Sequence, residues 1–172
     1  VSTLNLIHYG IENKIERLVY ASSMSTYGAV PDEAISESHE CRPLSCYGVG
    51  KHTSEGYLRV YQGKLPSVSL RMFNVYGPGQ DLSNLRQGMV SIYLSYFLNN
   101  EFKEVLVKGS KDRFRDFCYI EDVVNVTLQS INDKRFNNVV VNVGTGKKTT
   151  VHEVILEIEK NLSTNKPVVF KG

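Results

Sequence analysis

Short apolar runs alternate with longer amphipathic segments along the chain. Apolar positions recur at helical spacing in five segments, residues 3–14, 47–61, 89–100, 120–133 and 150–162, which predicts five helices. Strands are predicted at residues 17–22, 68–73, 104–109 and 138–144, and another begins within residues 166–172. The run 138–144 is continuously apolar, which is typical of a strand buried on both faces of a parallel sheet. This order of elements favours an α/β fold with a parallel sheet.

Composition and charge narrow the functional classes. The chain has 172 residues, of which 41% are hydrophobic and 22% charged, so one domain with a real core is possible. A net charge of +2 with scattered basic residues argues against nucleic-acid binding. No apolar run approaches the roughly 18 residues of a membrane helix, and the first residues do not resemble a signal peptide.

Cysteine and histidine spacing argues against metal or disulfide chemistry. The three cysteines, Cys41, Cys46 and Cys118, are odd in number and lack C-x-x-C spacing, so a reducing, cytoplasmic location is the default. The four histidines lie far apart in the sequence. We therefore predict no metal site.

Tyr47 and Lys51 are four residues apart in a predicted helix, which places the phenol and the ammonium on one face. A tyrosine acts as a base near neutral pH only if nearby positive charge lowers its pKa by about three units. An ordinary solvated pair has the same spacing. Gly48 and Gly50 each cost a helix about 1 kcal/mol relative to alanine, which a bulky group close to the backbone would justify.

The segment ASSMSTYG, residues 21–28, places four serine and threonine side chains at the end of a predicted strand and in the residues that follow it. Capping, turn formation and catalysis all explain such a cluster. The residues themselves leave these alternatives open.

Five blocks resemble, in order, the extended short-chain dehydrogenase/reductases that act on nucleotide sugars, the NAD-dependent epimerase/dehydratase family. The blocks are RLVYASSMSTYG, CRPLSCYGVGKHTSEGYL, LRMFNVYGPGQ, FRDFCYIEDVVN and VNVGTGKKTTVHEV. The resemblance spans most of the chain. It implies part of a Rossmann-type doubly wound parallel sheet with elements of a smaller substrate-binding domain, NAD as cofactor, a nucleotide-sugar substrate and a homodimer.

The resemblance also implies roles for individual residues. The catalytic set would be Ser23, Tyr47 and Lys51. The cofactor-binding set would be Ala21, Ser22, Tyr47, Lys51, Phe73 and Val75. The substrate-binding set would be Ser23, Ser25, Asn74, Gln87 and Arg115, and the arginine fork of the last suits a diphosphate. Arg71, Asp116 and Asp122 are expected to be structural, the first in a core ion pair, the second bracing a loop and the third starting a helix.

Two positions after Ser23 narrow the reaction. In the family that the chain resembles, sugar dehydratases carry an Asp-Glu pair just after the residue that corresponds to Ser23, and decarboxylating members carry a glutamate. This chain has Met24 and Ser25 at these positions. Neither side chain can act as an acid or base in elimination. We therefore favour reversible 4-epimerisation. The segment YGPGQDLSNLRQG resembles that of the family's UDP-sugar epimerases, which favours a UDP-hexose as substrate. The alternatives are an NAD(P)-dependent keto-sugar reductase and a non-catalytic Rossmann-like binding or scaffold protein.

One family block has no counterpart in this sequence. A G-x-x-G-x-x-G fingerprint, which cradles the NAD pyrophosphate, is absent. The residues thus resemble the central part of a longer enzyme, and the isolated chain is expected to bind NAD poorly. The expected division is 1–76 and 119–145 in the Rossmann domain, 77–118 as a substrate-binding insertion and 146–172 as the start of a substrate-binding segment.

The resemblance implies a homodimer in which the helix that holds Tyr47 and the helix before the strand that ends at the serines pack into a four-helix bundle. Tyr57, Leu58 and Tyr61 on one helix, with Leu4 and Ile7 on the other, are candidates for the interface. The same positions suit an ordinary core equally well.

Overall fold

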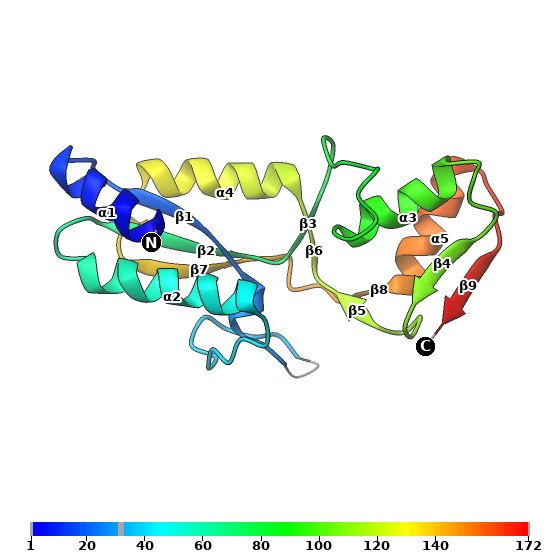
Figure 1. Ribbon diagram of the computed structural model, residues 1–172, viewed down its shortest axis with the longest axis horizontal. Coiled ribbons are helices and arrows are strands. Elements are labelled where there is room, and N and C mark those ends of the chain that lie inside the picture. Colours follow the sequence, from blue (N-terminus) through cyan, green and yellow to red (C-terminus); the bar gives the residue numbers. More distant parts are fainter. Residues whose placement is uncertain (1, 31–32, 172) are drawn as a thin grey trace. The chain divides into compact units, whose positions relative to one another are not determined.

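A computed structural model describes residues 2–30 and 33–171, which fall into two compact units (Figure 1). The first unit contains the described residues of 1–73 together with 121–143. The second unit contains 74–120 and the described residues of 144–172.

The first unit is built on a parallel three-stranded sheet. Its strands are β1 (Leu18–Ser23), β2 (Ser67–Met72) and β7 (Val139–Val143), in the order β1-β2-β7. Its helices are α1 (Ser2–Glu12), α2 (Cys46–Tyr61) and most of α4 (Ile120–Asn132), with short 3₁₀ turns η1 (Met24–Thr26) and η2 (Lys134–Phe136). Helices α2 and α4 lie on opposite sides of the sheet (Figure 1). This arrangement confirms the predicted α/β class with parallel strands.

The central strand is β2 and not the more apolar β7. Five of the six β2 residues are buried although three positions in Ser67–Met72 are serine or arginine. Strand β7 lies at the end of the strand order, and its Val139 remains 37% exposed. The prediction that residues 138–144 form a strand buried on both faces was therefore wrong. Burial here follows position in the sheet, which the hydropathy of one strand does not encode.

A small apolar cluster joins α1 to α2. Ile7, Leu58 and Leu65 are buried together, and Tyr57 and Tyr61 pack against them. The His8 imidazole hydrogen-bonds the Tyr61 hydroxyl at 3.0 Å. Ile7 and Leu58, predicted as candidates for a dimer interface, are therefore core residues of the first unit.

The second unit packs two helices against short strands. Helices α3 (Met89–Leu98) and α5 (Val151–Leu162) bury Tyr93, Phe97 and Ile155 together with β4 (Val105–Lys108), which pairs in parallel with β9 (Val168–Lys171). The remaining pairs are parallel β3 (Asn74–Tyr76) with β6 (Phe117–Tyr119), and antiparallel β5 (Phe114–Arg115) with β8 (Thr149–Thr150). None of these four strands was among those predicted from the sequence. They have two or three residues each, too few for a periodic pattern, so long-range pairing alone defines them.

Helix α5 begins where the sequence predicts it. The Thr150 side chain accepts a hydrogen bond from the Glu153 amide, and the Glu153 carboxylate accepts one from the Thr150 amide, which together form a capping box. Across the described part of the chain, no helix is long and apolar enough to cross a membrane.

Candidate functional site

The carboxyl end of β1 turns directly into a cluster of hydroxyls. Ser23 caps the 3₁₀ turn η1, and its Oγ accepts from the Ser25 amide at 3.2 Å and from the Ser25 hydroxyl at 3.0 Å. The Thr26 hydroxyl donates to the Ser23 carbonyl at 3.0 Å and is fully buried. Strand ends of this kind are where open α/β sheets bind ligands. Capping and turn formation thus account for part of the hydroxyl-rich segment, and Ser23 and Ser25 are brought together.

Helix α2 starts beside this turn. Ser45 is its N-cap, accepting a hydrogen bond from the Gly48 amide at 3.1 Å. A Cβ at Gly48 would lie 2.5 Å from the Ser25 carbonyl oxygen, so glycine is what allows the helix to approach the turn this closely. The close approach expected from the two glycines is confirmed at Gly48. At Gly50 a Cβ would meet nothing within 4 Å among the described residues.

Tyr47 and Lys51 project from the same face of α2. The Lys51 Nζ donates to the Ala21 carbonyl at 2.6 Å and lies 5.5 Å from the centroid of the Tyr47 ring. It also lies 5.1 Å from the Tyr20 ring centroid. Tyr47 is 59% exposed, and its hydroxyl makes no hydrogen bond to any residue that the structure describes. The phenol is thus open to a ligand while the ammonium is fixed to the end of β1.

A buried ion pair lies one turn farther along α2. Glu55 receives two hydrogen bonds from Arg71, Nε to Oε1 at 3.0 Å and Nη2 to Oε2 at 2.7 Å, and one from the Ser22 hydroxyl at 2.5 Å. Burial raises the pKa of Glu55, but the hydrogen bonds from Arg71 and Ser22 outweigh it, so this pKa is lowered. The expected structural role of Arg71 is confirmed. The Ser22 side chain points to Glu55, which leaves cofactor contact by Ser22 a prediction.

The second unit holds the remaining predicted substrate residues. The Asn74 side chain donates to the Asp116 carbonyl at 2.9 Å, and Asn74 has further interactions. Gln87 is exposed in the segment before α3. The Asp116 carboxylate accepts from the Thr145 amide and hydroxyl and from the Gly146 amide, at 2.7 to 3.0 Å. Asp116 therefore braces this loop as predicted. Asp122 lies in the first turn of α4, also as predicted.

Arg115 is the half-buried guanidinium of β5. Its Nη1 donates to the Phe114 carbonyl at 2.7 Å. Burial and then the charge of Arg113 lower its pKa, yet an arginine remains protonated at neutral pH. Within residues 2–30 and 33–171, neither arginine has a carboxylate within 4 Å. The cation is thus available for an anionic ligand.

The predicted cofactor residues fit only one end of NAD. The Lys51 ammonium uses one of its three N–H groups on Ala21, and the exposed Tyr47 hydroxyl is free, a donor set that suits ribose hydroxyls. Phe73 donates its amide to the Val143 carbonyl, and Val75 pairs with Cys118 in β3. The sequence lacks a glycine-rich fingerprint for the pyrophosphate. The groups of Lys51 and Tyr47 thus suit the nicotinamide-ribose end, and contact of Ala21, Phe73 and Val75 with NAD stays a prediction.

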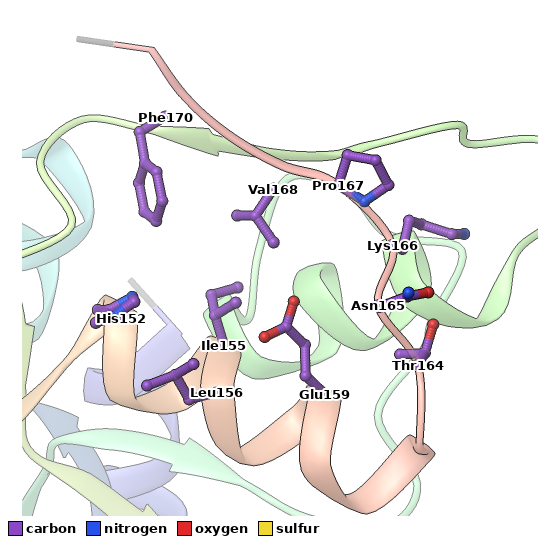
Figure 2. A pocket seen from close by; sticks show the side chains of 10 residues that line it. All are labelled: His152, Ile155, Leu156, Glu159, Thr164, Asn165, Lys166, Pro167, Val168 and Phe170. Atoms are coloured by element: carbon purple, nitrogen blue, oxygen red, sulfur yellow. The ribbon is translucent and has the colours of Figure 1, made fainter.

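A groove in the second unit involves none of the predicted site residues. It lies between α5 and the segment leading into β9, and Figure 2 shows Ile155, Leu156 and Val168 among its apolar lining with His152 and Phe170 at one end. The His152 and Phe170 rings meet edge-on with centroids 6.4 Å apart. The described residues contain no group of three histidine, cysteine or carboxylate side chains that could hold a metal ion.

Sequence reasoning missed two residues of the first-unit site. Ser45 sets the start of α2, and Glu55 joins that helix to β1 and β2. The spacing of Glu55 could have identified it from the sequence. Tyr47, Lys51 and Glu55 follow one another at four-residue intervals and so share one face of the helix. Nothing in the sequence identified the strand partners of Glu55.

Comparison with curated proteins shows similarity to enzymes named for sugar-nucleotide substrates. It is 34% identical over 158 residues to a putative UDP-glucose 4-epimerase of Methanocaldococcus jannaschii, covering 90% of this chain and 50% of the relative. It is 32% identical over 162 residues to the dTDP-4-dehydro-6-deoxyglucose reductase of Escherichia coli, covering 93% of this chain and 50% of the relative. The chain spans about half the length of these relatives.

Two solved structures of UDP-sugar 4-epimerases are also similar to this chain. A UDP-N-acetylglucosamine 4-epimerase from Methanobrevibacter ruminantium, in complex with UDP-N-acetylmuramic acid, matches with a TM-score of 0.92 and 28% identity over 98% of this chain and 54% of that one. A Thermus thermophilus UDP-glucose 4-epimerase in complex with NAD matches with a TM-score of 0.85 and 32% identity over 97% of this chain and 55% of that one. These similarities confirm the expected Rossmann-type fold.

A family model gives the assignment directly. The model described as the NAD dependent epimerase/dehydratase family matches residues 1–144, well over half of the chain. The matched range includes the Ser23 turn, the Tyr47 helix and the Arg115 strand. The chain therefore belongs to the NAD dependent epimerase/dehydratase family.

Proposed function

We propose that this chain supplies the catalytic residues and part of the substrate site of an NAD-dependent nucleotide-sugar 4-epimerase acting on a UDP-hexose. The observation that carries the proposal is the arrangement at the end of β1, where Lys51 is bound to the Ala21 carbonyl beside the exposed Tyr47 phenol and the Ser23 turn. The similarity to UDP-sugar 4-epimerases supports it. The activity would belong to the protein at its full natural length.

In this proposal Tyr47 moves the proton and the neighbouring residues assist it. The Tyr47 oxygen takes the proton of the sugar C4 hydroxyl, and the Ser23 hydroxyl hydrogen-bonds the same sugar oxygen. The Lys51 ammonium, 5.5 Å from the ring centroid, stabilises the negative charge of the deprotonated phenol. NAD, when bound, supplies the hydride acceptor and donor. Tyr47 returns the proton after the 4-keto sugar presents its opposite face.

The residues after Ser23 favour epimerisation over elimination. Met24 and Ser25 form η1, and neither side chain can remove or deliver a proton as a carboxylate would. Arg115 in the second unit would bind the diphosphate, because its guanidinium has no carboxylate partner among the described residues. Asn74 and Gln87 would contribute to the same substrate.

The test is conversion of a UDP-hexose into its C4 epimer by the full-length protein, with no net change in NADH. Replacing Tyr47 with phenylalanine should lower kcat by about 10²- to 10⁴-fold. Tyr9→Phe is the matched control, because Tyr9 and Tyr47 are both 59% exposed. A Tyr47→Phe variant with wild-type turnover would refute the proposed role of Tyr47.

The similarity to a reductase supports a second candidate function, the reduction of a nucleotide-bound keto sugar. The relative from Escherichia coli is a dTDP-4-dehydro-6-deoxyglucose reductase, and the same three residues could serve a keto-sugar reductase. Such an enzyme would consume one NAD(P)H for each sugar reduced. A stoichiometric fall in absorbance at 340 nm with a keto-sugar substrate would therefore replace the epimerase proposal.

We also propose that the 172-residue chain alone binds NAD only weakly and has little activity. The sequence lacks the fingerprint that would hold the pyrophosphate, and the described residues fit only the nicotinamide-ribose end. Calorimetric titration of the isolated chain with NAD⁺ tests this. Submillimolar binding would contradict the proposal.

The proposed homodimer would use apolar side chains that the core leaves exposed. Leu6 on α1 and Val60 on α2 are both largely exposed, whereas Ile7 and Leu58 are buried in the core. Exposed apolar groups on neighbouring helices favour association. Sedimentation of the full-length protein should give a dimer, and Val60→Glu should shift it towards the monomer.

A further inference from the structure

Helix α2 contacts the turn after β1 and the strand itself at three successive helical turns. Gly48 lies against the Ser25 carbonyl, Lys51 donates to the Ala21 carbonyl, and Glu55 accepts from the Ser22 hydroxyl. Positions 48, 51 and 55 fall on one face because they are three and four residues apart. The first two contacts are made by residues one and four positions after Tyr47. The third lies farthest from it and has no role in the chemistry proposed above.

Glu55 is buried and makes the largest number of hydrogen bonds among these three residues. It is 7% exposed, and its two carboxylate oxygens receive the three hydrogen bonds from Arg71 and Ser22 described above. One carboxylate therefore links α2 to β1 and to β2. The nearby His52 Nδ1 is buried and lies 3.7 Å from Glu55 Oε2, while the rest of the His52 side chain is partly exposed. No other charged group of the described chain lies within 4 Å of the Glu55 carboxylate.

A buried ion pair is a poor device for stability alone. Removing two charges from water is costly, and well-packed apolar residues of similar volume often stabilise a protein equally well. An apolar side chain at position 55 could not accept a hydrogen bond from Ser22, and Ser22 immediately precedes Ser23. The carboxylate therefore fixes the position and orientation of the helix that carries Tyr47 relative to the strand that ends at Ser23.

We propose that Glu55 is a positioning residue, which holds α2 against β1 and β2 through Ser22 and Arg71 and so sets the placement of Tyr47 relative to Ser23. This inference deepens the proposed function and rests on it for its catalytic consequence. Misplacement of reacting groups by about 1 Å can cost as much as 100-fold in rate. Loss of the Glu55 contacts should thus reduce turnover while leaving substrate binding largely intact.

The decisive variant is the double replacement Glu55→Leu with Arg71→Met in the full-length protein. It removes both charges together, so no unpaired buried charge remains, and it keeps similar side-chain volumes. We expect kcat to fall at least tenfold with little change in KM. Asp133→Asn with Arg135→Gln is the control, since it removes an ion pair of the same unit whose arginine is 88% exposed and should leave kcat unchanged. A double variant with wild-type kcat would overturn the inference.

Ser22→Ala provides a second, milder test in case the double variant does not fold. It deletes only the hydroxyl that joins β1 to Glu55. We expect a severalfold fall in kcat and faster hydrogen exchange at the Ser25 and Gly48 amides, because both amides lie where α2 meets the turn. Unchanged exchange together with unchanged kcat would also overturn the inference.

The exchange measurement separates this inference from the proposed function. If the wild-type protein shows no epimerase activity, the proposed function fails. Faster exchange at Ser25 and Gly48 in Ser22→Ala would still support the positioning role of Glu55 in that case. If the wild type is active and exchange is unchanged in a variant with normal kcat, only the positioning role fails.

Discussion

Replacing Gly48 with alanine tests whether stability and turnover require the close contact between α2 and the turn after β1. An alanine Cβ at this position would lie 2.5 Å from the Ser25 carbonyl oxygen and 3.0 Å from the Pro43 Cβ. The same substitution at Gly50, two residues along the same helix, meets nothing within 4 Å among the described residues. The two replacements change the helix in the same way and differ in what the added methyl group meets.

The expected magnitudes follow from two opposing effects. Alanine in a helix interior is about 1 kcal/mol more favourable than glycine, and this gain applies at both positions. Forcing a methyl group into a filled space costs about 1–3 kcal/mol, and this cost applies only at Gly48. We therefore expect Gly50→Ala to raise the free energy of unfolding by up to about 1 kcal/mol. Gly48→Ala should be about 1–3 kcal/mol less stable than Gly50→Ala.

Urea denaturation of the two full-length variants, followed by circular dichroism, measures this difference. Turnover supplies a second measurement. The Gly48 contact falls about 0.9 Å short of the 3.4 Å at which ordinary contact begins, so the helix or the Ser25 turn must move by that order. A shift of this size beside Tyr47 should reduce kcat by about tenfold or more. If Gly48→Ala is as stable and as active as Gly50→Ala, the argument from close approach is refuted.

Three further predictions concern single interactions. Asp116→Ala should destabilise the loop at Thr145 and Gly146 by about 1–3 kcal/mol, because the amides of both residues lose their acceptor. Hydrogen exchange at these two amides should be faster than in the wild type, and equal exchange rates would contradict the bracing role. Thr150→Ala should cost about 1 kcal/mol in urea denaturation because α5 loses its capping box, and no change would argue against that cap. The pKa of Glu55 is lowered in the folded protein, so its stabilising contribution is present above its ordinary value of 4.5 and is lost as the pH falls below it. The stability difference between the wild type and Glu55→Gln should therefore narrow below pH 4.5, and a constant difference from pH 6 to pH 3 would contradict this.

The helices and the longer strands could be predicted from the sequence because their signals are local. The periodic spacing in α2 and the capping pair Thr150 and Glu153 lie within a few residues of one another. The resemblance to the family rested on whole blocks of residues. It therefore did not depend on knowing which strands pair.

The candidate site could be predicted only in part. Tyr47 and Lys51 are recognisable as a pair because one helix carries both. Their roles, and those proposed for Ser23, Asn74, Gln87 and Arg115, remain predictions that the experiments above test. Hydroxyl clusters are ambiguous in sequence because capping, turns and catalysis use the same side chains.

Tertiary structure alone decided which contacts are buried and with what partner. The apolar run in β7 indicated a fully buried strand, yet β2, with serine and arginine among its residues, occupies the centre of the sheet. Arg71 can lie there because Glu55, 16 residues earlier in the chain, neutralises its charge and receives its hydrogen bonds. The sequence by itself thus determined the helices, the longer strands and the family, whereas the shortest strands, the sheet order and the buried polar partners depended on long-range packing that no local pattern encodes.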